Sequence, residues 1–481
     1  MLFHISFRSR LGATLCLAMA AGAGSIALAQ NPTSAQNPFY GSVTAASATG
    51  DVLKLSLDEA VSRGLKNNLG LKESESQQKY LHGQKNEAEQ YFLPTIVLNG
   101  STGAHQYNLV QNGFSTGAID EFAKLLHTSF AGFSPVTHDE LTEGKIFYSQ
   151  TLFSGPVIAA FQGASAAEKA AYYDRMKARE EVVQQVAAAY LHVIAAQSEI
   201  ENARALVRQA ELLASQAHES HEAGVAANLD ELRAQVELKN RQQALIAAEN
   251  AYEKQQILLK REIGLDPGQK IELTDPAPYN ELAAETPAEV RAVAFKSRQD
   301  YKSLQNQMVE NTAIHQAYRY QRLPSLSFNG YYAVSKVTDV ASRGNFAAVG
   351  TVSMPLFREA GLRGAIDASG AQREATRAQL EDLRGQIDAQ VRTALLDVDA
   401  TERLVKVARS NVELATRTVS DETDRVSAGV DDNLPLVTAQ ASLASAESNL
   451  VESLYQYNLA KLALARTAGV LETQYREYLG R

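Results

Sequence analysis

Two long stretches of the chain carry apolar residues at alternating spacings of four and three. The first seam consists of Val182, Val186, Ala189, Val193, Ala196, Ile200, Ala203, Val207, Ala210, Ala214 and Ala217. The second runs in the same rhythm from Ile387 to Val419. A heptad repeat of this length predicts long coiled-coil helices, each roughly 100 Å at 1.5 Å per residue. Alanine at alternate positions of the first seam predicts a partner helix that approaches closely.

Four shorter segments alternate with period two instead. In 325–335, apolar and polar residues occupy opposite faces, with Tyr331 and Ala333 interrupting the polar row. The apolar set is Leu326, Phe328, Tyr332 and Val334, and the polar set is Ser325, Ser327, Asn329 and Ser335. This pattern is typical of a transmembrane barrel strand, and 345–354, 95–104 and 145–153 follow it less cleanly. Four strands cannot close a barrel, whereas three copies of the chain would supply twelve.

The chain is an internal duplication. Capping boxes begin at Ser56 and at Thr286, 230 residues apart, and each opens a 36-residue segment that we expect to be helical. These segments end at Leu93-Pro94 and Leu323-Pro324, where strands are expected to begin. Leu152-Phe153 matches Leu356-Phe357, and Gly224 matches Gly429, at offsets of 204 and 205, so the first copy carries 26 extra residues.

The predicted helix after the second strand ends at Gly224, because glycine readily adopts the left-handed conformation of a helix C-cap. A return helix restarts within 228–232 and runs back to Gly264. The extra residues of the first copy lie in 105–143, where a surface loop and a short helix at 119–126 are expected. The predicted organisation is a signal peptide at 1–29, an extended arm at 30–55, a first repeat at 56–264, a linker at 265–285, a second repeat at 286–470 and a C-terminal tail at 471–481.

Composition changes the picture at the N-terminus. Arg8 and Arg10 precede an apolar run that ends in Ala27-Leu28-Ala29, a pattern typical of a secretory signal cleaved after Ala29. Cleavage would remove Cys16, the single cysteine, and leave 44 basic against 55 acidic residues, a net charge of −11 in place of −9. We therefore expect no disulfide, no lipid anchor and no nucleic-acid partner. After residue 29 no apolar run approaches the ~20 residues of a membrane helix.

Two short motifs are weighed against chance. The stretch from Gly113 to Gly117 reads Gly-Phe-Ser-Thr-Gly, the pattern of a hydrolase nucleophile, but it falls among loop-forming residues rather than between a strand and a helix. His218 and His221 share one helix face just before Gly224, yet an organised third metal ligand is missing from the pattern. Neither motif predicts catalysis, a cofactor or a metal site.

The order of these features resembles the TolC-type outer membrane efflux protein family from about Leu53 to Leu471. Capped helix, Leu-Pro strand, Leu-Phe strand exit, long helix, glycine-marked turn and return helix all occur twice. The resemblance implies a mainly α fold with a membrane β-barrel portion, in which long antiparallel helices form a periplasmic α-barrel and four strands per protomer join a trimeric 12-stranded barrel. It implies a homotrimer in outer-membrane lipid of a Gram-negative bacterium that docks a periplasmic adaptor and an inner-membrane pump, and acts as a conduit rather than an enzyme.

The resemblance also assigns candidate sites at the two turns. Docking of the adaptor is expected at the periplasmic tip, formed by Gly224, Val225, Asn228, Leu229, Gly429, Val430, Asn433 and Leu434. The entrance acids are expected to be Asp230, Asp431 and Asp432. The second turn has Asp431-Asp432 where some relatives have an arginine, so either an acidic ring or solvated turn residues fit these two positions.

The heptads alone would also fit a secreted coiled-coil scaffold or stalk. The alternating strand segments favour the channel, because a stalk has no need for apolar-faced strands at matching places in both copies. Drug efflux, metabolite efflux and type I protein secretion are not separable from the chain itself.

Overall fold

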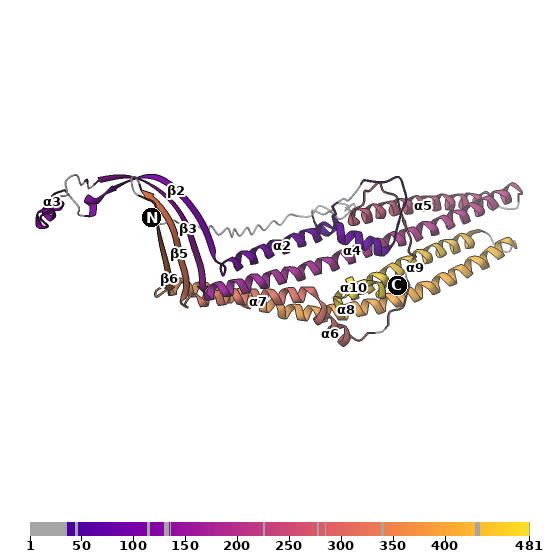
Figure 1. Cartoon of the computed structure of the whole chain (residues 1–481). Coiled ribbons are helices and arrows are strands. Elements are labelled where there is room, and N and C mark those ends of the chain that lie inside the picture. The colour runs from indigo at the N-terminus through magenta and orange to yellow at the C-terminus, as the bar shows by residue number, and fades with distance from the viewer. Residues whose placement is uncertain are drawn as a thin grey trace, which may run out of the picture.

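The computed structural model describes residues 36–43, 47–112, 116–128, 134, 136–224, 227–276, 279–283, 285–337, 341–428 and 433–480. It is an elongated molecule with a β-sheet at one end of a set of long helices (Figure 1). Val225, Gly429, Val430, Asp431 and Asp432, together with the predicted signal peptide, lie outside the described residues.

The elements of the first half follow the predicted order. They are η1 (Pro38–Tyr40), β1 (Leu53–Leu55), α1 (Leu57–Asn67), α2 (Leu69–Gln90), β2 (Thr95–Asn108), η2 (Leu109–Asn112), α3 (Thr116–Leu125), β3 (Val136–Phe153), α4 (Gly155–Glu222), α5 (Asn228–Ile263) and β4 (Ile271–Leu273). The second half repeats the order with α6 (Pro287–Ser297), α7 (Gln299–Tyr320), β5 (Ser325–Val337), β6 (Arg343–Ser353), α8 (Glu359–Ser427) and α9 (Asn433–Ala468), and ends with α10 (Leu471–Tyr478). The duplication read from the sequence is therefore a duplication of structure.

The two 36-residue segments are helical, as predicted, but neither is one continuous helix. Each is divided, α1 from α2 at Asn68 and α6 from α7 at Arg298. The Asn68 side chain accepts a hydrogen bond from the Leu71 N–H at 3.2 Å and so begins α2 as its N-cap. Each short first helix contacts both long helices of its hairpin, α1 with α4 and α5, and α6 with α8 and α9.

The two predicted capping boxes differ. At Thr286 both reciprocal bonds are present, with the Glu289 carboxylate accepting from the Thr286 N–H at 3.0 Å. At Ser56 the prediction is half right, because the hydroxyl accepts from the Glu59 N–H at 3.2 Å while the Glu59 carboxylate pairs with Arg63 at 2.7 Å. The N–H of Leu57, the first residue of α1, donates to the Asp275 carboxylate at 2.7 Å.

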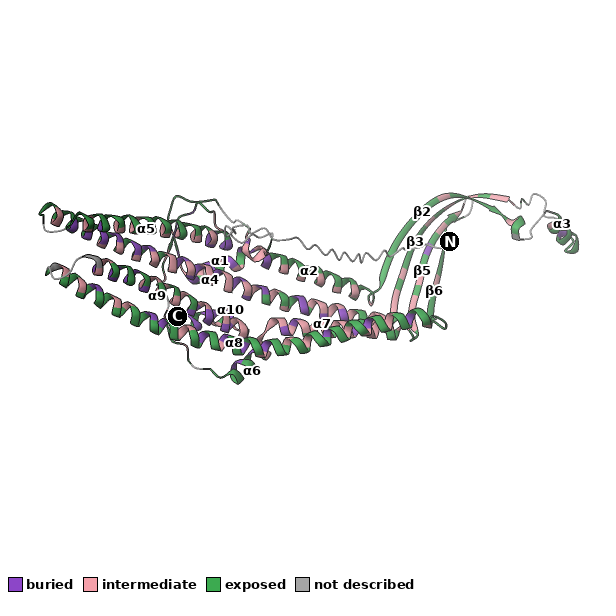
Figure 2. Cartoon of the chain, turned by 180° about the vertical axis from the view of Figure 1, so that it is seen from behind, coloured by how far each residue is buried: buried purple, intermediate pink, exposed green. Residues whose placement is uncertain are grey.

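The long helices α4 and α8 span 68 and 69 residues, each about 100 Å. Both seams predicted from the heptads are largely buried, with Val182, Val186, Ile387 and Val391 wholly inaccessible to solvent. These four residues belong to one hydrophobic core that also takes in α1, α9 and α10, whereas the seam residues Ala217 and Val419 belong to a second, smaller core. Buried residues gather along the helices in Figure 2, whereas the sheet is nearly all exposed or half-buried. Among the described helices, none is both long enough and apolar enough to cross a membrane.

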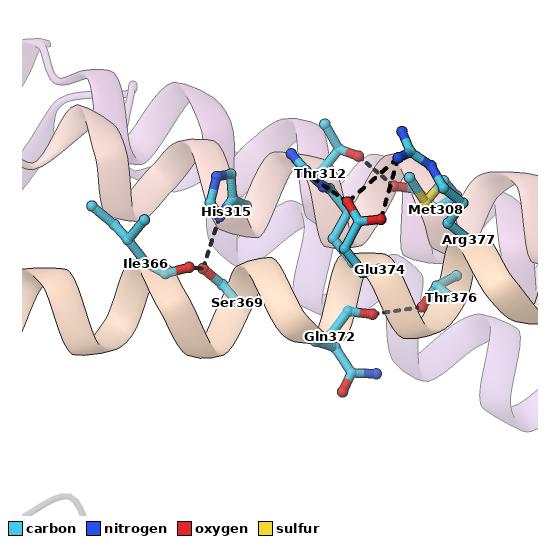
Figure 3. Close-up of polar contacts among 10 residues, drawn as sticks. Met308, Thr312, His315, Ile366, Ser369, Gln372, Glu374, Thr376 and Arg377 are labelled. Atoms are coloured by element: carbon cyan, nitrogen blue, oxygen red, sulfur yellow. Dashed lines mark hydrogen bonds and ion pairs between the residues drawn. The ribbon is translucent and has the colours of Figure 1, made fainter.

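Close helix packing is visible where α7 lies against α8. Figure 3 shows His315 of α7 pointing at Ser369 of α8, with Nδ1 and Oγ 3.1 Å apart. The Asn311 side chain donates to the Thr376 hydroxyl at 2.9 Å, and both Ser369 and Thr376 are buried. Small polar residues thus let the two helices approach and join them by hydrogen bonds.

The four-stranded sheet has the strand order β2-β3-β5-β6, so β2 and β6 are its edge strands. All of its strand pairs are antiparallel. The β2–β3 ladder continues to the pair Asn108 and Val136, whereas β5 ends at Val337, opposite Leu141. β2 and β3 are longer than predicted. The sequence pattern missed their outer parts, because these are polar and lack the alternation of apolar and polar residues that marks the rest. The predicted short helix of the insertion is α3, which lies beyond the end of the sheet (Figure 1).

Candidate functional site

The two faces of the sheet have opposite chemistry. Leu98, Ile146, Tyr332 and Phe346 are directly paired across the four strands, so they form one continuous apolar row. The next row along the strands, on the opposite face, consists of Asn99, Lys145, Ala333 and Asn345. Successive side chains of a strand point to opposite faces, so the register confirms the apolar face predicted from the alternation. The opposite face is polar in most rows, but one row on it consists of Val97, Phe147, Tyr331 and Ala347.

Among the described residues, nothing covers the apolar face. Leu98 is 75% exposed, Phe346 77% and Val352 72%. An apolar sheet face of this extent is unfavourable in water and matches the lipid-facing surface of a membrane barrel. A barrel built from this sheet would place the opposite, more polar face toward its interior.

Both Leu-Pro pairs lie at the junction of helix and strand, as predicted. Pro94 comes directly before β2, and Pro324 directly before β5. The junction is tied by a hydrogen bond from the Gln150 amide of β3 to the Phe92 carbonyl, at 3.1 Å. Leu323 lies near the start of α4, where a side chain at Gly155 would meet Leu323 and Tyr320. Proline ends each helix here because it cannot continue the hydrogen-bond ladder.

The opposite end of the molecule is the turn between α4 and α5. Gly224 has φ +74°, the left-handed conformation predicted for it, and α5 begins at Asn228. Asn228 and Leu229 are exposed, as a docking surface requires. In the second repeat α9 begins at Asn433, followed by Leu434, while the preceding residues of that turn lie outside the described chain.

An apolar groove of about 360 Å³ runs along α5 just behind this turn. Leu229, Leu232, Val236 and Val437 line it, so α5 of the first repeat and α9 of the second meet here. A separate small core of Leu213, Ala217, Ala234, Val419, Leu436, Ala439 and Leu443 holds the two helix hairpins together behind the groove.

Of the three predicted entrance acids, only Asp230 lies in the described part of the chain. Its carboxylate pairs with Arg233 at 3.3 Å, one turn further along α5. Asp230 also lies in the first turn of α5, where the helix dipole favours a negative charge. The local partner and the helix start both stabilise this carboxylate. The contribution of Asp431 and Asp432 stays a prediction.

The two histidines near the turn belong to a cluster that links α4 to α5. His218 Nδ1 lies 2.9 Å from Glu231 and its Nε2 3.5 Å from Glu222, while His221 Nε2 lies 4.0 Å from Glu231. The bond to Glu231, helped by the nearby Glu222 charge, raises the pKa of His218. The sequence spacing singled out the histidines but not Glu231, which is their shared partner on the opposite helix. The Gly113 to Ser115 part of the hydrolase-like motif lies outside the described residues.

Midway along the helices, ion pairs connect the first repeat to the end of the second. Arg179 of α4 binds Glu472 of α10 at 2.5 Å, and Arg466 of α9 pairs with Glu181 of α4. Beside them, Glu180 faces a cavity of about 380 Å³. Burial, together with the charges of Glu472 and Asp300, raises the pKa of Glu180 to about 7.

Two further buried ionisable groups lie in this middle region. Burial raises the pKa of Glu262 on α5 to about 8, and it lowers that of Lys461 on α9 to about 8. Lys461 is fully buried and donates to the Asn280 carbonyl at 3.2 Å. The heptad pattern could not identify these residues, because it marks which positions are apolar and carries no signal for a charged residue that packing covers.

The fold and its two-faced sheet define a class of protein, the outer-membrane channels with a helical extension. The chain is similar to the Campylobacter jejuni CmeC outer membrane channel at 14% identity, covering 88% of this chain and 89% of that chain with a TM-score of 0.71. It is similar to the Vibrio cholerae outer membrane protein VceC at 16% identity, covering 86% and 96% with a TM-score of 0.70. The open state of the Neisseria gonorrhoeae MtrE outer membrane channel matches at 17% identity, covering 86% and 89% with a TM-score of 0.69.

The family itself follows from the sequence match. The family model described as outer membrane efflux protein matches residues 60–265 and 292–470, one segment in each structural repeat. The chain belongs to the outer membrane efflux protein family, as its motifs indicated. No curated protein sequence matches it.

Proposed function

We propose that this protein is the outer-membrane exit duct of a tripartite efflux or type I secretion system. It receives its cargo from a periplasmic adaptor and an inner-membrane pump, and passes it outward without chemistry. The observation that carries the proposal is the two-faced sheet. One face is exposed and apolar, the other is polar, and a bundle about 100 Å long continues from one end of the strands.

A homotrimer is part of the proposal. β2 and β6 are the edge strands of the four-stranded sheet, and each could pair with a strand of a neighbouring copy. Twelve strands from three copies would close a barrel and remove both edges, which an isolated sheet in lipid cannot leave unpaired. The exposed apolar positions of α5 and α8, among them Ile246, Leu396 and Leu404, would then be covered by neighbouring copies.

The adaptor is proposed to dock at the turns that end the helix hairpins. The apolar groove lined by Leu229 offers a contact surface that the described residues leave open, bordered by Arg233 and Glu237. Gly224 and Asn228 shape the first turn, while Val225, Gly429, Val430, Asn433 and Leu434 complete the docking site as predicted from the sequence.

The test has a pore arm and a docking arm. Purified protein in a planar lipid bilayer should produce discrete conductance steps, and chemical crosslinking should give a trimer. In cells, a photocrosslinker at Leu229 should capture the adaptor, whereas one at the exposed Lys254, about 38 Å along the same helix, should not. A mature protein that fractionates as soluble and forms no pores would favour the alternative, a secreted coiled-coil scaffold.

A further inference from the structure

The polar face of the sheet carries few charges, and their positions are distinct. In the part where all four strands are paired, the charged residues on this face are Glu143, Lys145 and Arg343. Glu143 and Arg343 lie in one row, Ser101–Glu143–Ser335–Arg343, and Lys145 lies in the next polar row. These rows are at the end of the sheet farther from the helices, because β5 begins at Ser325 and they pair with its residues Ala333 and Ser335.

Lys145 is held in a defined place. Its Nζ lies 3.3 Å from a Glu143 carboxylate oxygen, 4.1 Å from the centre of the Tyr331 ring and 5.0 Å from that of Phe147. The Lys145 side chain is 21% exposed, so part of it reaches the surface of this face. Aromatic rings that flank an ammonium stabilise its charge and limit its motion.

Arg343 adds a second positive charge that Glu143 does not cancel locally. The two residues are separated by β5, roughly 10 Å at two strand spacings. The Arg343 side chain is exposed, and within the described chain it has no ion pair. The polar face at this level therefore carries two positive charges and one negative charge, in a protein whose total formal charge is −9.

We propose that Lys145 and Arg343 form a positive belt on the lumen wall, near the outer end of the barrel, that favours the passage of anions over cations. This inference rests on the proposed channel function and identifies residues that determine its selectivity. A charge on a wall backed by low-dielectric lipid acts on ions along the whole cross-section within about a Debye length, ~10 Å at 0.1 M salt. In a trimer the belt carries six positive charges, and counting the three Glu143 carboxylates leaves a net charge of +3 at this level.

The strands supply a matched control. Lys336 lies one row from Arg343 along β5 but on the opposite, apolar face, because it pairs with Thr142 whereas Glu143 pairs with Ser335. Substituting Lys336 removes the same charge at nearly the same height of the barrel without changing the lumen wall. A comparison of the two faces thus separates a lumen effect from a general effect of net charge.

The experiment measures the reversal potential of the full-length channel in a planar bilayer under a KCl gradient near 0.1 M. We expect R343Q to lower the anion-to-cation permeability ratio and the double variant K145Q/R343Q to lower it further, by about threefold. K336Q should leave the ratio unchanged. R343Q is the informative variant if loss of Lys145 disturbs the packed aromatic rings, because Arg343 takes no part in that packing.

An unchanged permeability ratio in R343Q and in the double variant overturns the belt, and so does an equal fall in K336Q. In both cases pores still form, so the channel function stands. If the wild-type protein forms no pores, the proposed function fails first and the belt fails with it.

Discussion

Glu262 is a buried carboxyl group whose ionisation the fold makes less favourable. It lies on α5 with 1% exposure, and its Oε2 has no hydrogen-bond partner within the described chain. The other oxygen faces the Gln185 amide of α4 at 3.4 Å, a long hydrogen bond. Burial without a cation raises the pKa of Glu262 from its usual 4.5 to about 8. Replacement by glutamine keeps the shape and the contact to Gln185 but removes the charge.

The magnitude follows from linkage. Because the folded pKa lies above the unfolded one, the folded state holds the proton longer, and stability falls as pH rises from about 4.5 to about 8. A shift of about 3.5 units at ~1.4 kcal/mol each gives a full cost of ~5 kcal/mol, and ~4 kcal/mol at pH 7.5. Glutamine cannot ionise, so E262Q should match the wild-type stability at pH 4.5 and exceed it by a few kcal/mol at pH 8.

The assay is chemical unfolding of the detergent-solubilised protein, followed by circular dichroism at 222 nm from pH 4.5 to pH 9. The quantity of interest is the difference in free energy of unfolding between E262Q and wild type at each pH. E253Q is the control, because Glu253 is exposed on the same helix and its replacement should change the free energy of unfolding only slightly.

A difference between E262Q and wild type that stays flat across this range would refute the reasoning. So would an E262Q variant that is less stable than wild type at pH 8. Either result would mean that water or a cation reaches the Glu262 carboxylate in the folded protein.

Three further predictions concern the helices. Y190F should destabilise the fold by about 1–2 kcal/mol in the same assay, since it removes the hydroxyl that bonds the Leu55 carbonyl at 2.9 Å and the Asp275 carboxylate at 2.8 Å. G224A should speed hydrogen exchange at the α4–α5 turn, because alanine at φ +74° costs about 1 kcal/mol, whereas G361A in an open stretch of α8 should slow exchange there. Because the pKa of His218 is raised, its bond to Glu231 stabilises the turn fully below pH ~6.5. The stabilisation is lost as the pH rises through the pKa of His218 in the folded protein. Hydrogen exchange of H218Q should therefore differ from wild type at pH 6 and converge with it at high pH.

Local signals in the sequence were enough to predict the architecture. The left-handed φ of Gly224 and the positions of Pro94 and Pro324 were predicted because each depends on backbone geometry that only glycine or proline meets. The heptads located α4 and α8 because burial in a coiled coil follows the period of the helix.

The remaining features depend on contacts between distant segments. The break at Asn68 coincides with the packing of Asn67 against the end of α5, where its amide donates to the Ile263 carbonyl at 3.0 Å. Glu231 joins His218 only after α5 folds back on α4. The belt of Lys145 and Arg343 becomes visible once strand register shows which face each residue occupies, since a slip of one residue would reverse both.

The central claim is that the sheet spans a membrane with one face in lipid and the other in water. Asn345 and Phe346 are neighbours on β6 that the register assigns to opposite faces, and Phe346 is 77% exposed in the isolated chain. The single cysteine of the sequence, Cys16, lies in the predicted signal peptide, so a cysteine introduced elsewhere would be the only one in the mature protein. In native membranes a water-soluble, membrane-impermeant thiol reagent should label N345C readily and F346C hardly at all, with F346C becoming reactive after the lipid is removed. Equal labelling of both positions in native membranes would contradict the account.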